Sequence, residues 1–182
     1  AKTFLRVDHA DDDTLIANQV IAARRAAELR TGRALITQTW DLYLDQFPPG
    51  DELLIPLPPL VSITSVIYTD TAGVSTTWAA SKYIVSTGRE PGRITRAFGE
   101  SWPVSRTQAD AVKVRFIAGF GAAADVPQLL KSGLLLLVGH LYENRLPVVT
   151  GTIAAELPLS VERIFDSFAV GDEFAQYAGR NE

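Results

Sequence analysis

The spacing of apolar residues changes twice along the chain and separates two helical segments from a β segment. Between residues 11 and 31 it is the spacing of one helix face, every three to four positions, at Ile16, Val20, Ala23 and Ala27. Aspartates at positions 11 to 13 precede this pattern and Gly32 follows it. Carboxylates favour a helix N-terminus and glycine favours a C-terminal cap, so the pattern predicts a helix over about residues 11–31.

From residue 34 the period falls to two, which is the period of a β-strand. Gln38, Trp40, Leu42 and Leu44 alternate with polar or aromatic neighbours. Residues 70–73 have the composition of a hairpin turn. Strands are predicted over about residues 35–45, 52–55, 63–69, 74–78, 83–86, 93–96 and 111–118. Short strands separated by turns indicate a small antiparallel sandwich or barrel.

Helical spacing returns after the glycines at positions 119 and 121. Pro127 suits a first helical turn and Pro147 suits a stop, so a helix is predicted over about residues 127–145. A last helix is predicted over about residues 158–168. Its packing residues are predicted to be Leu159, Ile164, Phe165 and Phe168.

The predicted fold class is α+β, in which a helical core bundle formed by both ends of the chain holds an inserted antiparallel β sandwich or barrel-like unit. The predicted division is a first part of the helical core at residues 1–33, the β unit at 34–118, a second part of the core at 119–168, and an extended C-terminal tail at 169–182.

Composition narrows the function. The chain has 182 residues, of which 47% are hydrophobic and 21% charged, which is typical of a globular protein. Its net charge of −4 argues against a surface that grips nucleic acid throughout. It has no cysteine and only two histidines, which excludes disulfides and cysteine-ligated zinc. No apolar run reaches the roughly 18 residues of a membrane span, so we expect no membrane partner.

One segment resembles a nucleotide-binding motif. Residues 119–124 match Gly-x-Gly-x-x-Ala after a strand. Asp125 and Pro127 delay the helix, and no acidic residue ends a second strand about 20 residues later, as a ribose contact requires. We interpret the glycines as a turn and expect no cofactor.

Other candidate groups have an ordinary structural interpretation. Asp8, His9 and the aspartates at 11–13 suggest a cation site but lack an EF-hand pattern, so a solvated helix start is favoured. His140 has no nucleophile motif beside it in the sequence, and we interpret it as a packed histidine. Two arginine groups are interpreted as a helix end and a solvated loop rim, with an acidic or nucleic-acid partner as the alternative for the second. They are Arg24, Arg25, Arg30 and Arg33, and then Arg89, Arg93, Arg96 and Arg106 with Phe98 and Trp102. We therefore expect no catalytic or metal site.

A series of short motifs, in a fixed order, resembles a known family. Leu5 to Asp8 precede the acidic helix start, and ThrGlyArgAlaLeuIleThrGlnThrTrp joins helix to strand at residues 31–40. The later motifs are ProProLeu at 58–60, SerValIleTyr at 65–68, AspThrAlaGly at 70–73, ProGlyArgIle at 91–94, TrpPro at 102–103, AlaGlyPheGly at 118–121, ValPro at 126–127 and TyrGluAsnArg at 142–145. In this order they resemble the head–tail connector, or head-completion adaptor, family of long-tailed phages and gene-transfer particles.

The resemblance implies a structural virion protein of the neck, assembled in the bacterial cytoplasm. Family members form rings, usually dodecameric, that bind the portal, extend the DNA channel and receive the next neck or tail-completion protein. DNA passes through without sequence-specific binding, which suits a net negative charge. The alternatives are another neck or tail-completion protein, or a nucleotide-binding or hydrolytic domain. Relatives have residues before the Leu5 motif, so we expect that an upstream segment is missing here.

The C-terminal tail is the predicted portal-docking segment. Phe168, Val170, Phe174 and Tyr177 are spaced without a helical or strand stripe that would bury them in the subunit. Spaced aromatic anchors on an extended segment are a common docking device. The family resemblance implies that this segment reaches the portal, and we expect it to become ordered on assembly.

Overall fold

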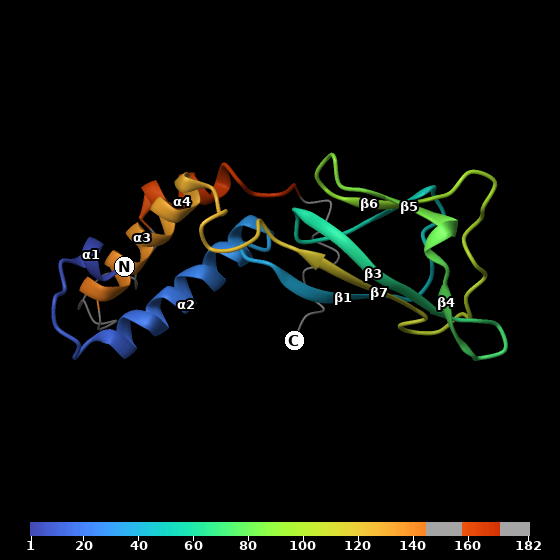
Figure 1. Cartoon of the computed structure of the whole chain (residues 1–182), viewed down its shortest axis with the longest axis horizontal. Helices are drawn as coiled ribbons and strands as arrows, with labels where there is room; N and C mark the ends of the chain where they lie inside the picture. The colour runs from blue at the N-terminus through green and yellow to red at the C-terminus, as the bar shows by residue number, and fades with distance from the viewer. Residues whose placement is uncertain (145–157, 172–182) are drawn as a thin grey trace, which may run out of the picture. The chain divides into compact units, whose positions relative to one another are not determined.

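The computed structural model describes residues 1–144 and 158–171 (Figure 1). Along these residues, two helices come before the β-strands and two helices come after them. The described residues form two compact units. Residues 1–32, 124–144 and 158–171 form a helical unit, and residues 33–123 form a β unit. The prediction of an α+β fold with antiparallel sheets is confirmed.

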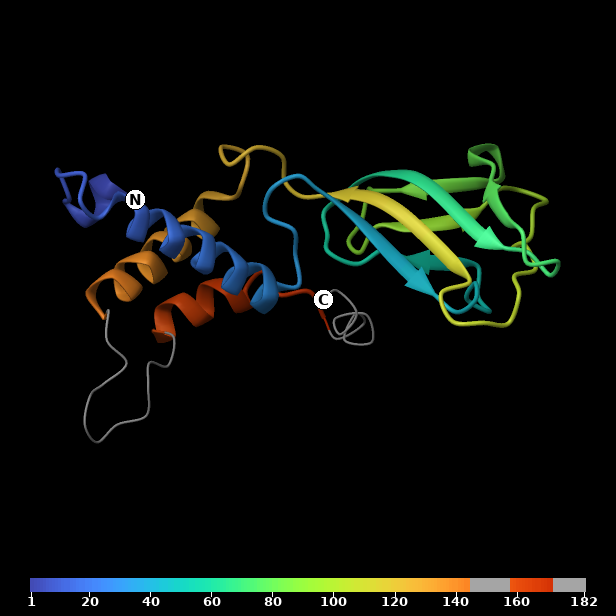
Figure 2. The same ribbon diagram turned by 90° about the horizontal axis from the view of Figure 1, so that it is seen from below.

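The helical unit contains α1 (Lys2–Leu5), α2 (Asp13–Thr31), α3 (Gln128–Glu143) and α4 (Leu159–Asp166). Helices α2, α3 and α4 each pack against the other two (Figure 2). Their shared interior is apolar. It is filled by Ile16, Ala23, Ala27, Leu130, Leu137, Val138, Val161 and Phe165. This burial, more than intrinsic propensity, stabilises helices of such modest length.

A glycine in the middle of α3 permits the close approach of α4. A Cβ atom on Gly133 would lie 2.9 Å from Ile164 Cγ2 and 3.0 Å from Phe165 Cε1. These distances are below ordinary carbon contact, so a larger residue would force the helices apart. Gly139, two turns further along α3, faces the flexible ring of Phe4 at 3.2 Å instead.

The predicted helices are present, with ends that differ by one or two residues. The helix predicted from residue 11 begins at Asp13, and the last helix ends at Asp166. The predicted packing of Leu159 is wrong, because its side chain is 71% exposed. Val20, which follows the helical spacing of α2, is also exposed. The short helix α1 was not predicted, because four residues are too few to display a helical period.

Two antiparallel sheets form the β unit. The first has the strand order β1 (Gln38–Leu44), β7 (Val112–Ala118), β3 (Leu60–Thr69), β4 (Ser75–Trp78). The second has the order β2 (Glu52–Leu54), β6 (Arg93–Arg96), β5 (Tyr83–Ser86), and the 3₁₀ turn η1 (Ala80–Lys82) precedes β5. Within residues 33–123, all of which are described, neither sheet closes into a barrel.

One apolar core fills the β unit and receives side chains from both sheets. Leu42, Val114 and Phe116 contribute from the first sheet, and Leu53 and Ile94 contribute from the second. An aromatic cluster extends this core. In it, Phe47 stacks on Trp102 with ring centroids 5.2 Å apart, and Trp78 contacts both rings. The arrangement is a sandwich rather than the barrel-like alternative.

The glycines after β7 have a structural role. Gly119 has φ of +127° and Gly121 has φ of +124°. A Cβ on Gly119 would lie 2.3 Å from the carbonyl oxygen of Ile36. The carbonyl of Gly121 accepts a hydrogen bond from the amide of Thr37 at 2.9 Å. The segment after β7 therefore lies against the residues that lead into β1, and α3 begins only at Gln128.

Candidate interaction surface

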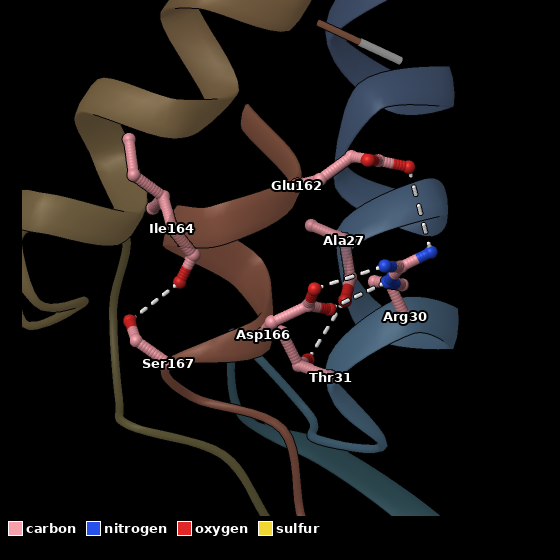
Figure 3. Close-up of polar contacts among 7 residues, drawn as sticks. All are labelled: Ala27, Arg30, Thr31, Glu162, Ile164, Asp166 and Ser167. Carbon is pink, nitrogen blue, oxygen red and sulfur yellow. Dashed lines mark hydrogen bonds and ion pairs between the residues drawn. The ribbon is translucent and has the colours of Figure 1, made fainter. Parts of the chain in front are cut away.

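The carboxyl ends of α2 and α4 are joined by a charged contact (Figure 3). The Arg30 guanidinium donates two hydrogen bonds to Asp166, from Nε to Oδ1 at 2.7 Å and from Nη2 to Oδ2 at 3.0 Å. Its Nη1 atom lies 3.7 Å from Glu162 Oε1. The fork of arginine matches a carboxylate in this way, so the contact fixes the orientation of the last turn of α4.

This contact shifts the pKa values of both partners. The hydrogen bond from Arg30, and then its charge, hold the pKa of Asp166 below its usual value. The hydrogen bond and charge of Asp166 raise the pKa of Arg30. Both side chains are substantially exposed, and exposed ion pairs add little to stability. The contact therefore links the last turns of α2 and α4 without adding much to stability.

The residues after α4 make backbone hydrogen bonds to the end of α4 and to α2. The Phe168 amide donates to the Phe165 carbonyl at 2.9 Å, and the Val170 amide donates to the Thr31 carbonyl at 2.9 Å. Gly32 ends α2 with a φ of +67°, which favours glycine, and a Cβ atom there would lie in ordinary contact with Val170 Cβ at 3.8 Å. The chain is thus attached to the helical unit as far as Gly171.

The structure describes two of the four predicted portal-docking residues. Phe168 and Val170 are half-buried. The free carbonyl of Thr31 at the C-terminus of α2 accepts the Val170 amide. The role of both residues in portal docking stays a prediction. Phe174 and Tyr177 lie outside the described residues.

The acidic cluster near the N-terminus connects helices. Asp12 accepts a hydrogen bond from the Tyr142 hydroxyl of α3. Asp13 Oδ1 lies 2.6 Å from Lys2 Nζ, and Asp11 lies 3.8 Å from the His9 ring. Asp12 makes no side-chain cap on α2, so the expected capping is wrong at this position. No group of three or more His, Asp or Glu side chains in residues 1–144 and 158–171 is placed to hold a metal ion.

His140 makes a local contact. Its Nδ1 atom lies 3.2 Å from the amide nitrogen of Asn144, one helical turn further along. Its Nε2 atom is buried and has no hydrogen-bond partner in the part of the chain that the structure describes. The ring therefore makes no described hydrogen bond to a serine or an aspartate, which a catalytic triad would need.

Four of the eight arginines in the two groups lie beside carboxylates, including Arg30 with Asp166. Arg93 Nη1 lies 2.7 Å from Glu52, Arg96 contacts Asp51, and Arg33 Nη1 lies 2.6 Å from Glu90. This pairing lowers the positive charge that the second group presents to solvent. Phe98, at the tip of its loop, is fully exposed.

One charged group on the β unit was missed by the sequence analysis. Asp41 of β1 lies opposite Arg115 of β7 and accepts two hydrogen bonds from its guanidinium, at 2.7 and 2.8 Å. Lys113 Nζ lies 3.0 Å from the same carboxylate. These hydrogen bonds and charges lower the pKa of Asp41 to about 2. The alternation of the strand does place Asp41 on its outward face. Its partners Arg115 and Lys113 could not be predicted, because they depend on the strand order.

No described helix is both long and apolar enough to cross a membrane. No protein-family model and no curated protein matches the chain.

Solved structures of gene transfer agent particles contain similar chains. A chain in the neck of an empty particle, with C6 symmetry, has a TM-score of 0.73 and 29% identity over 92% of this chain and 85% of that one. A chain in the neck of a native particle, with C12 symmetry, has a TM-score of 0.70 and 28% identity over 86% and 82%. A chain in the native virion has a TM-score of 0.72 and 28% identity over 90% and 81%. These similarities support a structural protein of the neck of a phage-like particle.

Proposed function

We propose that this protein is a head–tail connector subunit that forms a ring in the neck of a tailed-phage-like particle, binds the portal and extends the DNA channel. The observation that carries the proposal is the similarity to neck chains of gene transfer agent particles over 86% to 92% of this chain. A match of this length must include residues of both the helical unit and the β unit, so the similarity is not limited to one of them.

The chemistry of the described residues supports a structural role. Their titratable groups are engaged mainly in contacts that connect helices or strands, such as Arg30 with Asp166 and Asp41 with Arg115. A subunit that assembles into a closed ring needs two different surfaces, one for each neighbour. The net charge of −4 suits a channel wall along which DNA moves without being held.

We further propose that the segment after Gly171 docks on the portal, with Phe174 and Tyr177 as anchors. The described residues give it a fixed origin, because Val170 is hydrogen-bonded to Thr31 at 2.9 Å. A fixed origin in each subunit of a ring would present many copies of the segment at once, and multivalency increases retention without new contacts.

The test uses portal-bearing heads that lack this protein. Purified full-length protein should be retained on these heads and should add a ring whose copies are counted by electron microscopy of the neck. A variant that ends at Gly171 keeps the contacts of Val170 and should fold, yet should be washed away. Failure of the full-length protein to bind would overturn the connector proposal, and normal retention of the shorter variant would overturn only the tail contact.

The copy number separates this proposal from the alternative that the chain is another neck or tail-completion protein. Twelve copies adjoining the portal would agree with the C12 neck that contains a similar chain. A different copy number, in a ring placed away from the portal, would favour the alternative. We propose no enzymatic activity. Turnover in a screen of nucleotides and esters by assembled rings would contradict that part.

A further inference from the structure

Two helices of the helical unit each carry large apolar side chains on the face turned away from the core. On α2, Ile21 is 58% exposed and Leu29 is 68% exposed. On α3, Leu129 is 50% exposed and Leu136 is 40% exposed. Single exposed apolar residues are common, but these occur in pairs at helical spacing. Each pair therefore forms one apolar line along its helix.

The line on α2 also carries a charge. Ile21, Arg25 and Leu29 are four residues apart, so they share one face. Arg25 is exposed and forms no ion pair with any residue in the described ranges. We call these three residues the α2 strip. A partner that covers this strip must also supply an acidic group, since an unpaired charge in an apolar contact is costly.

The line on α3 has the opposite charge. Leu129, Leu136 and Glu143 are seven residues apart and again share one face. Glu143 is the only carboxylate of α3, is exposed, and has no ion-pair partner among residues 1–144 and 158–171. We call these three residues the α3 strip. Phe4, which is 48% exposed, flanks it beside Gly139.

The two strips carry opposite charges but differ in length. Ile21 and Leu29 are separated by about 12 Å along the axis of α2, and Leu129 and Glu143 by about 21 Å along α3, at about 1.5 Å per residue. With Arg25 opposite Glu143, the α2 strip therefore covers the part of the α3 strip from Leu136 to Glu143. Each strip has two apolar side chains and one unpaired charge, and the charges are of opposite sign. The strips lie on different helices that already pack against one another through other faces, so they do not cover each other within one subunit.

We propose that the α2 strip of one copy packs against the α3 strip of the next copy, with Arg25 paired to Glu143 across the contact. This inference rests on the proposed ring and identifies the residues that close it. A contact between two different patches of one subunit is heterologous, and such contacts close into rings when the rotation between copies is correct. The symmetric necks that contain similar chains supply the reason for choosing a second copy as the occupant.

The first test uses charge reversal, followed by the mass of the assembly on purified portal rings. Arg25→Glu and Glu143→Arg should each lower ring yield by on the order of tenfold or more. The double variant should restore the yield, because the pair is then re-formed with its signs exchanged. Arg163→Glu, an exposed reversal on α4 outside both strips, should leave the yield unchanged. Circular dichroism of each variant establishes that the helices are intact.

The second test uses cross-linking, for which a chain without cysteine is well suited. A variant with both Ile21→Cys and Leu136→Cys should oxidise to a ladder of covalent multimers. Either single variant should give no covalent multimers under the same conditions. Cross-linking of Ile21→Cys alone would reveal a symmetric contact and overturn the inference. Full ring yield from both single charge reversals would also overturn this inference and leave the connector proposal intact. A wild-type protein that forms no ring would overturn the connector proposal itself.

Discussion

The contact between α3 and α4 yields a prediction whose sign is opposite to the ordinary expectation for a helix. Replacing a glycine in a helix interior by alanine normally stabilises a protein by about 1 kcal/mol. At Gly133 the new Cβ would lie 2.9 Å from Ile164 Cγ2 and 3.0 Å from Phe165 Cε1. Overpacking of this kind costs about 1 to 3 kcal/mol. We therefore expect Gly133→Ala to destabilise the helical unit by about 1 kcal/mol.

Gly139→Ala is the matched control, because it makes the same change in the same helix. There the new Cβ meets the outer ring atoms of Phe4 at 3.2 Å, and Phe4 is 48% exposed and can move. The ordinary gain of up to about 1 kcal/mol should then appear. The two variants should differ by about 2 kcal/mol, which corresponds to a difference of roughly 10 °C in Tm for a unit of this size.

The assay can follow the two units separately. The three tryptophans of the chain, at positions 40, 78 and 102, all belong to the β unit. Tryptophan fluorescence therefore reports unfolding of the β unit, while circular dichroism at 222 nm reports mainly the helices. The dichroism transition should shift in Gly133→Ala and the fluorescence transition should not. Ile164→Ala removes the clashing methyl group, so the double variant should lose less stability than the sum of the single changes. Additive losses, or a Gly133→Ala variant as stable as Gly139→Ala, would refute the packing argument.

Three further predictions concern other contacts. Gly119→Ala places a Cβ 2.3 Å from the Ile36 carbonyl at φ of +127°, so it should destabilise the β unit by about 2 kcal/mol or more; an unchanged fluorescence midpoint in urea would contradict this. The pKa of Asp41 is lowered from 3.8 to about 2 in the folded chain, so its contribution to stability is complete above pH 4 and is lost as the pH falls toward 2. The urea midpoint of wild type should then fall more steeply than that of Asp41→Asn over this range, and parallel curves would refute the assignment. Asp166→Asn should increase hydrogen exchange of the α4 amides more than Glu162→Gln, because Arg30 makes its bidentate bond to Asp166; equal exchange in the two variants would argue against it.

Much of the β unit could be predicted because its signals are local. β5 and β6 have the predicted bounds, and the predicted turn at residues 70–73 joins the antiparallel strands β3 and β4. Strand order is not local. Nothing in the sequence near Asp41 indicates that β7, more than 70 residues away, supplies its two cations.

The helical unit shows where periodicity misleads. Val20 follows the apolar spacing of α2 yet is exposed, because the face of a helix that is buried depends on where its neighbours lie. Leu159 was predicted to pack, but α4 buries Val161 and Phe165 instead. The pairing of Arg30 with Asp166 joins residues 136 positions apart, so only the tertiary structure reveals it.

The contact between Gly121 and Thr37 has a consequence for the engineering of this fold. Because the Thr37 amide bonds to the Gly121 carbonyl at 2.9 Å, the chain enters and leaves the β unit at almost the same point. Closing the gap between such neighbouring points needs only a few residues and costs little chain entropy. We therefore expect that removing the whole sandwich, or replacing it by a foreign domain with adjoining termini, leaves the helical unit folded.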